Sequence, residues 1–268
     1  MTRPAEAYLD ACRGLLETVA AQTEQIRQAA NWFAETILAG RMVHLFGAGH
    51  SRILVEEMWP RYGSFPGFHP IVELSLTYHN AVVGANGQRQ AMYLETVSGL
   101  AERILRNFDL SERDCAMVVS SSGCNTVPVE LAEQFRARGM RVVALISLRH
   151  CQASASKHPR GLKLTDVADL VLDTGAPAGD AMVAIEGLST PVSPGSTVGG
   201  CILVNAIKAE VAARLTAAGQ PPRVLTASCV AGADQSAQLF EAAYDEHAHR
   251  LARLYQNVGH GGVDDPQP

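Results

Sequence analysis

The sequence predicts an α/β fold with three layers, in which helices cover both faces of a doubly wound parallel sheet. Five strand-sized apolar segments alternate along the chain with segments of helical spacing, and this alternation is typical of parallel sheets with crossover helices. The segment 114–147 has the pattern of a complete strand–helix–strand unit, with Gly139 placed to end its helix. In such sheets ligands bind at the carboxyl ends of the strands, near the point where the strand order reverses.

The individual elements follow from periodicity and from Gly and Pro punctuation. Residues 4–38 have apolar side chains at helical spacing and predict one or two helices, which Gly40 ends. We expect five strands, at 42–46, 70–76, 114–120, 141–147 and 169–173. We expect further helices at 53–59, 88–108, 127–138, 201–215 and 233–255, with a Gly/Pro/Ser-rich stretch over 175–200. The chain then divides into an N-terminal helical segment (1–40), an α/β domain (41–220) and a C-terminal helical tail (221–268) that begins with two prolines.

The composition excludes several classes of protein. The 268 residues, 47% of them hydrophobic, are enough for one large domain or two small ones. A formal net charge of -5 does not favour binding to nucleic acid or to an anionic membrane surface. The apolar runs are strand-sized, and the first ten residues lack the order of a signal peptide. Six scattered cysteines without a C-x-x-C pair make a disulfide framework unlikely on spacing grounds, so we expect a cytoplasmic protein.

The strongest functional signal lies where the third predicted strand ends. The strand runs into Ser120-Ser121-Ser122-Gly123, and Asn125-Thr126 then open a helix. Hydroxyls, backbone N–H groups and the positive end of a helix dipole converge there, which favours a phosphate or another anion. A similar turn, Gly47-Ala48-Gly49-His50-Ser51, follows the first strand. The two turns together predict a site for a phosphorylated small molecule.

A third turn, Ser193–Thr197, opens the last core helix. Helix capping by Ser196 or Thr197 accounts for these residue types, and their expected position at the same sheet edge also allows ligand contact. The complete set of predicted ligand-binding residues is Gly47, Gly49, Ser51, Ser120, Ser121, Ser122, Gly123, Asn125, Thr126, Ser196 and Thr197. No Cys/His spacing predicts a zinc site, because His247 and His249 are two residues apart on a helix and do not share a face. We expect no metal and no cofactor.

The segments 46–51, 120–125 and 193–197, in this order and spacing, resemble the SIS (sugar isomerase) domain family. The resemblance covers roughly residues 5 to 220, and is to a branch related to phosphoheptose isomerases and, more distantly, to N-acetylmuramic acid 6-phosphate etherases. It implies a flavodoxin-like five-stranded sheet, a phosphosugar ligand, and a homodimer or homotetramer with sites at subunit interfaces. It also implies that Ser120, Ser122 and the backbone of their loop hold the phosphate. The family's Ser or Thr at the sixth position of this loop is replaced by Asn125, and Thr126 is a second candidate for its role.

The resemblance also suggests catalytic residues. The phosphoheptose isomerase pattern E-E-x-x-x-R-Y is matched by residues 56–62, which implies that Glu57 is the catalytic base. The etherase pattern implies a site role for Glu186. Phosphoheptose isomerases also have a histidine in the last core helix, and the residues around 197–199 include none. Moving a carbonyl between two carbons of a sugar phosphate needs both a base and a polarising or acidic group, so His50 is the main candidate for the second role, ahead of His69 and His79.

These residues leave three functions open. The first is an aldose–ketose isomerase that acts on a phosphosugar, and the second is an etherase-like lyase. The third is a phosphosugar sensor without catalysis. A DNA-binding regulator is disfavoured because the segment before the first strand is short for a helix-turn-helix domain and the chain is acidic. A dinucleotide enzyme is disfavoured because Gly47-x-Gly49 lacks the third glycine, with Arg52 in its place. The apolar faces of the 88–108 and 201–215 helices predict at least a homodimer.

Overall fold

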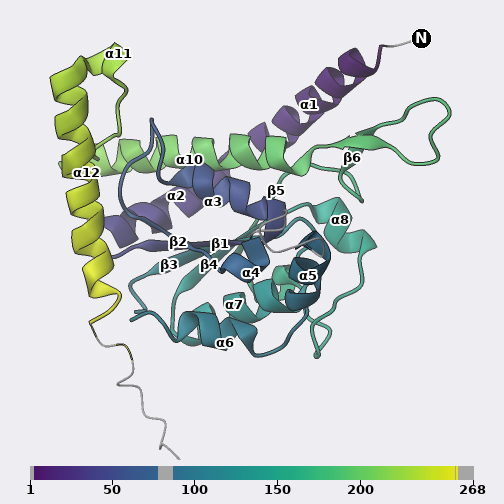
Figure 1. Cartoon of the computed structure of the whole chain (residues 1–268), viewed down its shortest axis with the longest axis horizontal. Helices are drawn as coiled ribbons and strands as arrows, with labels where there is room; N and C mark the ends of the chain where they lie inside the picture. Colours follow the sequence, from purple (N-terminus) through teal and green to yellow (C-terminus); the bar gives the residue numbers. More distant parts are fainter. Residues whose placement is uncertain (1–2, 78–86, 257, 259–268) are drawn as a thin grey trace, which may run out of the picture.

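The computed structural model describes residues 3–77, 87–256 and 258, and it confirms the predicted α/β class. The central sheet has five parallel strands in the order β2-β1-β3-β4-β5 (Figure 1). The strands are β1 (Val43–Gly47), β2 (Phe68–Ile71), β3 (Cys115–Val119), β4 (Arg141–Ile146) and β5 (Leu170–Asp173). The order reverses between β1 and β3, so their carboxyl ends border the crevice where ligands of such sheets bind.

Each face of the sheet has its own hydrophobic core, because successive side chains of a strand point to opposite faces. Val43, Leu45 and Met117 belong to the core under α2 (Thr23–Leu38), α3 (Arg52–Met58) and α10 (Ser196–Ala217). Phe46 and Val118 belong to the core on the other face. That second core is covered by α6 (Leu100–Leu105), α7 (Thr126–Ala137) and α9 (Leu164–Val167). Figure 1 shows the two helical layers above and below the sheet.

Two glycines allow the long helix α10 to lie close to the sheet. A Cβ atom at Gly199 would lie 2.0 Å from the carbonyl oxygen of Thr174, and one at Gly200 would lie 2.2 Å from the Leu54 side chain. Real Cβ atoms do not approach this closely, so only glycine permits this packing. The consequence for function is that the first turn of α10 reaches the carboxyl edge of the sheet.

Several element boundaries differ from the sequence-based expectations. The second strand lies at 68–71 rather than 70–76, and Leu74–Thr77 forms the short helix α4. The helix expected over 88–108 is divided into α5 (Gly87–Leu94) and α6. Gly99 lies between them with a φ of 85°, in the left-handed region, and its N–H donates to Glu130 Oε2 over 2.9 Å. Glu130 lies 31 positions away in the sequence, so local periodicity cannot predict this contact or the break in the helix.

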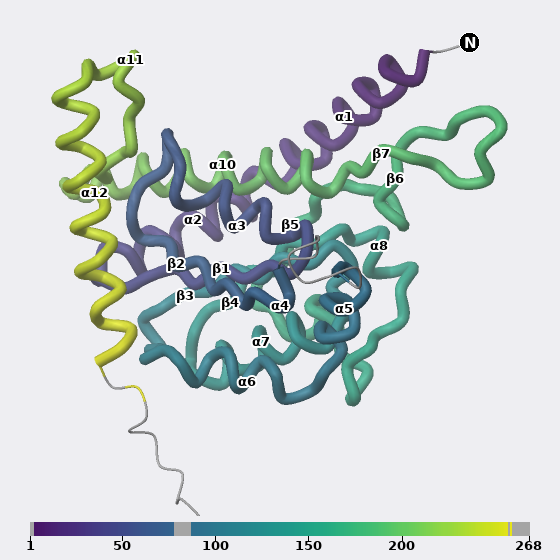
Figure 2. The backbone as a smooth tube through the Cα atoms, in the orientation of Figure 1, coloured from purple at the N-terminus to yellow at the C-terminus, as the bar shows by residue number. Residues whose placement is uncertain are grey.

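The Gly/Pro/Ser-rich stretch is also more ordered than the sequence predicts. It forms an antiparallel hairpin of β6 (Ala181–Val183) and β7 (Val192–Pro194), and α10 then begins at Ser196 rather than at 201. The short helices α8 (Leu148–Ala153) and η1 (Gly49–Ser51) follow β4 and β1 directly. Figure 2 shows the hairpin projecting from the end of the molecule opposite to α12.

The N- and C-terminal helices pack on the α/β unit. The helix α1 (Pro4–Ala20) precedes α2, and Tyr8 Oη donates to the Pro194 carbonyl over 2.9 Å. After α11 (Ser228–Ala231), α12 (Ala233–Arg253) crosses one end of the sheet (Figure 1). Arg250 on α12 donates to the carbonyl oxygens of Ile37 and Arg41 over 3.2 and 3.0 Å. Among the described residues no helix has the length and apolarity needed to span a membrane.

Candidate functional site

A small cleft lies at the carboxyl edge of the sheet, where the sequence predicts the site. Its volume is about 120 Å³. It is lined by residues at or after the ends of β1, β3, β4 and β5, by Leu54 of α3, by Asp180 just before the 181–183 strand, and by the first turn of α10; the lining residues are His50, Ser51, Leu54, Val119, Ser121, Leu145, Thr174, Asp180, Ser196 and Thr197. Five of these residues were predicted as site residues, so the three turns singled out in the sequence meet around one cavity.

Within the Ser120–Asn125 loop, Ser121 is the serine that lines this cleft. Its Oγ lies 3.2 Å from Nδ1 of His150, on α8. The other two hydroxyls hold the loop together: Ser120 Oγ accepts from the Gly123 N–H over 3.2 Å, and Ser122 Oγ accepts from the Cys124 N–H over 3.3 Å. Gly123 has a φ of 63°, which glycine adopts without strain. The loop is therefore shaped by Ser120 and Ser122, while Ser121 faces the space where a ligand would lie.

Asn125 and Thr126 anchor the far side of this loop. Asn125 Nδ2 donates to Glu95 Oε2 over 2.5 Å, and Thr126 Oγ1 donates to the Lys157 carbonyl over 2.9 Å. Neither side chain lines the cleft. Burial raises the pKa of Glu95 above its ordinary value, against the opposing effects of the Asn125 hydrogen bond and of Lys157. No local sequence signal marks Glu95 as part of this loop, because its partner Asn125 lies 30 residues further along the chain.

The first turn is closed by its glycines. A Cβ atom at Gly47 would lie 2.6 Å from the Ser51 carbonyl oxygen, and Gly49 has a φ of 54°. The turn thus needs glycine at 47 for space and at 49 for conformation. It places His50 and Ser51 on the wall of the cleft and begins α3.

The first turn of α10 is capped by Asp180, which the sequence analysis did not single out. Asp180 Oδ1 accepts from the N–H groups of Ser196 and Gly195 over 2.6 and 3.0 Å. Its Oδ2 accepts from Ser196 Oγ over 2.7 Å. The capping group predicted for this helix was Ser196 or Thr197, and the structure assigns the role to a carboxylate from the hairpin instead. No local signal marks it, because residues 180 and 196 become neighbours only when β6 and β7 pair.

Glu57, the predicted base, lies outside the cleft. It lines a wider groove of about 580 Å³ together with Tyr62, Phe240 and Tyr244, among others. Its carboxylate accepts from Asn205 Nδ2 over 2.8 Å and is paired with Arg61. Burial by itself raises the pKa of Glu57, but the hydrogen bonds from Asn205 and Arg61 outweigh it, and the net effect is a lowered pKa. The paired carboxylate therefore has a reduced proton affinity, which makes it a weaker base than an unpaired glutamate.

The remaining predicted catalytic residues are dispersed. Glu186 is exposed at the tip of the β6–β7 hairpin and does not line the cleft. His69 lies on β2, in a network at the opposite edge of the sheet. His79 lies outside the described residues. In the part of the chain that the structure describes, no group of His, Cys, Asp and Glu side chains has the arrangement of a metal site.

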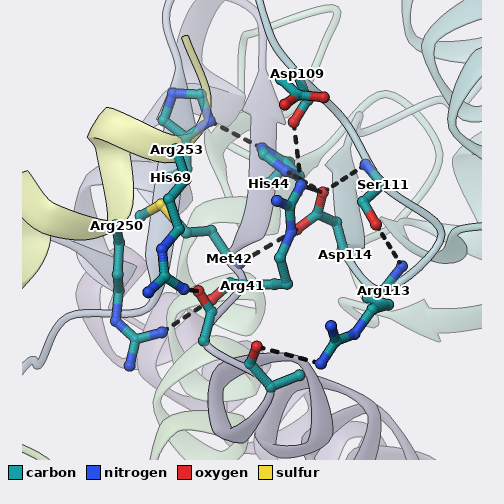
Figure 3. A network of polar contacts seen from close by, with 12 residues as sticks. Arg41, Met42, His44, His69, Asp109, Ser111, Arg113, Asp114, Arg250 and Arg253 are labelled. Carbon is teal, nitrogen blue, oxygen red and sulfur yellow. Dashed lines mark hydrogen bonds and ion pairs between the residues drawn. The ribbon is translucent and has the colours of Figure 1, made fainter. Parts of the chain in front are cut away.

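The network that contains His69 is built around a buried carboxylate (Figure 3). Asp114 accepts from Nε and Nη2 of Arg41 over 2.8 and 2.6 Å and from the Ser111 N–H over 2.8 Å. Its Oδ2 lies 3.6 Å from Nε2 of His44, and Nδ1 of His44 lies 2.9 Å from Nδ1 of His69. Burial alone raises the pKa of Asp114, but His44 and Arg41 outweigh it and lower the pKa to about 2. This network belongs to the amino edge of the sheet, away from the cleft.

Comparison with known proteins identifies relatives of the whole chain. A family model described as SIS domain matches residues 7–147. A UPF0309 protein of Listeria innocua is 32% identical over 252 residues, which are 94% of this chain and 98% of that protein. A UPF0309 protein of Halalkalibacterium halodurans is 34% identical over 232 residues, covering 85% of this chain and 93% of that protein. Among solved structures, phosphoheptose isomerase from Neisseria gonorrhoeae aligns with 79% of this chain and 96% of its own, at 15% identity and a TM-score of 0.47.

Proposed function

This chain belongs to the SIS domain family and to the UPF0309 proteins, and from this membership and the geometry of the cleft we propose that it binds a phosphorylated sugar. One observation carries the proposal. The loop that opens α7, the turn after β1 and the first turn of α10 all border one cavity at the carboxyl edge of the sheet. This is the position at which doubly wound sheets bind ligands.

The phosphate is assigned to the Ser120–Asn125 loop. The loop leads directly into α7, whose N-terminus supplies partial positive charge and N–H donors for an anion. The Ser121 hydroxyl faces the cleft and is held by His150. A cleft of about 120 Å³ is smaller than the roughly 300–1,000 Å³ of typical ligand pockets, so it accommodates the phosphate and the adjoining part of a sugar.

Calorimetric titration tests this proposal with pairs of ligands that differ only in the phosphate, such as fructose 6-phosphate and fructose. We expect the wild-type protein to bind the phosphate ester much more tightly than the free sugar. Ser121→Ala should lower the affinity for the phosphate ester by about tenfold, because it removes a hydrogen bond to a charged group. Ser236→Ala, on α12, is the matched control: it removes a hydrogen bond to the Thr226 carbonyl, and the affinity for the phosphate ester should not change. Equal affinities for fructose and its phosphate would contradict the proposal.

As a finer proposal, the chain isomerises its phosphosugar between aldose and ketose, with Glu57 as the base. The match of residues 56–62 to the isomerase pattern supports this role, while the lowered pKa of Glu57 makes its carboxylate a weaker base than an unpaired glutamate. Within one chain Glu57 lines a groove separate from the cleft. Its action on a sugar held at the Ser120–Asn125 loop therefore requires a second copy of the chain, the homodimer that the family resemblance implies.

Adjacent glutamates on α3 provide a matched pair for this test. Glu57→Gln should abolish turnover of the sugar phosphate while its binding stays within about threefold of the wild type. Glu56→Gln, which removes the Glu56–Arg52 ion pair, should retain turnover. Full turnover by the Glu57→Gln protein would remove Glu57 from the mechanism.

Binding without turnover is the second candidate function. It is favoured by the position of Glu57 and Glu186, since neither predicted catalytic carboxylate lines the cleft. A protein that binds a sugar phosphate in the titration and neither isomerises nor cleaves it would be a phosphosugar sensor. Measured turnover of any bound sugar phosphate would exclude this alternative.

A further inference from the structure

Two parts of the cleft wall, Ser121 of the Ser120–Asn125 loop and the start of α10, differ in their charge. The Ser120–Asn125 loop contains no acidic residue, and the Glu95 carboxylate that contacts it bonds to the Asn125 side chain, which does not line the cleft. The start of the 22-residue helix α10 is occupied by the Asp180 carboxylate, which accepts three hydrogen bonds from residues 195 and 196. A helix N-terminus stabilises negative charge, and at α10 the protein itself supplies that charge through Asp180.

Asp180 is held firmly in this position. Its own carbonyl oxygen accepts from the Gly195 N–H over 3.1 Å, in addition to the carboxylate contact with the same group. Its backbone has a φ of 71°, and Ser193, across the same end of the hairpin, has a φ of 69°. A positive φ is uncommon outside glycine and is more frequent for Asp than for most residues. The start of the β6–β7 hairpin thus adopts an unusual conformation where it presents this carboxylate.

The carboxylate also has capacity for a ligand. An ionised carboxylate has about four acceptor positions on its two oxygens. Gly195 and Ser196 fill two on Oδ1 and one on Oδ2 with the bonds given above. Asp180 lines the cleft, so the further position on Oδ2 suits a hydroxyl or an ammonium group, both of which donate, and not a phosphate oxygen, which accepts.

We propose that Asp180 determines the orientation in which the ligand binds and selects against ligands that carry a second phosphate. The phosphate binds at the Ser120–Asn125 loop, and the opposite end of the sugar, carrying hydroxyl or amino groups, faces Asp180. A second phosphate at that end is excluded, because the Asp180 carboxylate would repel it and already accepts the hydrogen bonds of the N–H groups at the start of α10. The substrate class is therefore a sugar monophosphate rather than a bisphosphate. This inference rests on the proposed function and adds a specificity determinant to it.

The test uses three probes, inorganic phosphate, fructose 6-phosphate and fructose 1,6-bisphosphate, titrated into the full-length protein. We expect the wild type to bind one inorganic phosphate per cleft and to prefer the monophosphate by at least tenfold. Asp180→Asn keeps the size of the side chain and one acceptor oxygen but removes the charge. It should bind the bisphosphate at least tenfold more tightly than the wild type does, and so lose the preference. Asp180→Glu, which retains the charge, should keep it.

The outcomes distinguish a failure of this inference from a failure of the proposed function. If the wild type binds none of the three probes, the proposed function is contradicted and this inference with it. If the wild type binds phosphate esters but Asp180→Asn leaves the preference unchanged, the inference alone is overturned. Circular dichroism and urea unfolding check that each variant folds. Asp180→Ser, a second neutral residue that caps helices well, replaces the asparagine variant if that one is unfolded, with the same expected loss of preference.

Discussion

The two edges of the central sheet both collect polar side chains, and they use them differently. At the amino edge, Asp114 is fully buried and its carboxylate is enclosed by Arg41, Ser111 and His44. At the carboxyl edge, Ser121, Ser196 and Asp180 border an open cleft. The first group satisfies its charges within the protein. The second group keeps hydrogen-bonding capacity that faces the cavity.

This difference separates structural polar residues from candidate binding residues. Histidines, an aspartate and an arginine clustered at one place are also the composition of many catalytic sites. At the amino edge, Nδ1 of His44 and Nδ1 of His69 lie 2.9 Å apart, so one of them donates to the other, while His44 Nε2 lies 3.6 Å from Asp114 Oδ2 and has no hydrogen-bond partner in the described part of the chain. This chain of contacts joins β1, β2 and the segment before β3 (Figure 3). It stabilises the sheet, and the candidate binding site lies at the opposite edge.

The largest expected effect comes from removing the centre of the amino-edge network. Asp114→Ala leaves Arg41, whose side chain is 16% exposed, without its partner. Removing one member of a buried ion pair costs about 3–5 kcal/mol, and we expect this loss in the free energy of unfolding, measured with urea. Arg41→Met together with Asp114→Leu removes both charges and should recover part of the loss. A change below about 1 kcal/mol in Asp114→Ala would show that the network does not stabilise the sheet.

The second effect is the dependence of stability on pH. Burial, followed by the neighbouring His44 and His247, lowers the pKa of His69 well below its ordinary 6.5. Below pH 6.5 the unfolded chain therefore binds a proton at this position that the folded chain does not. Stability falls with decreasing pH in that range, by about 1.4 kcal/mol per pH unit for one such group. Asp114, with a pKa lowered to about 2 from 3.8, adds a loss of about 2 kcal/mol between about pH 4 and pH 2.

Urea unfolding at pH 7.5, 6.5 and 5.5 measures the histidine contribution. We expect His69→Gln to flatten the decline between pH 6.5 and 5.5, although the variant is less stable at pH 7.5. His249→Gln, on the exposed side of α12, serves as the control and should follow the wild-type profile. A profile of His69→Gln that runs parallel to the wild type would assign the decline to other groups.

The third effect concerns the loop at the carboxyl edge. Ser122→Ala combined with Asn125→Ala removes the acceptor for the Cys124 N–H and the donor to Glu95. We expect sugar phosphates to bind about tenfold more weakly, equivalent to about 1.4 kcal/mol, because the loop that positions Ser121 is loosened. The affinity for free sugars should stay the same. An equal loss for both kinds of ligand, measured by calorimetry, would show that the loop does not recognise phosphate.

The smallest effect is expected for an exposed ion pair on the surface, which belongs neither to the amino-edge network nor to the cleft. Glu24 and Arg27 lie 2.6 Å apart on α2, with side chains that are 81% and 50% exposed. Glu24→Gln should change the free energy of unfolding by no more than about 0.5 kcal/mol, and phosphate binding should not change. A larger effect would mean that burial is not what distinguishes the amino-edge network from other ion pairs.

Much of the fold was predictable because its signals are local. Apolar runs such as 141–147 and the helical period of 127–138 depend on near neighbours in the sequence, and the structure places β4 and α7 at nearly the same residues. The chain between 88 and 108 was predicted wrongly as one helix, because its break at Gly99 is stabilised by Glu130 from another helix. The membership in the SIS family, inferred from three short segments, is confirmed by the family model and by relatives of nearly full length.

The sequence by itself determined the sheet, the order of elements along the chain and the three turns at the carboxyl edge. These features depend on residues that are neighbours in the sequence, such as glycine and serine directly after a buried strand. Only the tertiary structure decided which side chains of those turns face the cleft. It turned Ser121 into the cleft and used Ser120, Ser122 and Asn125 to hold the loop. It also brought Asp180 to the start of α10 and placed Glu57 in a separate groove. These arrangements depend on contacts between residues distant in sequence, which are formed only when the whole chain packs.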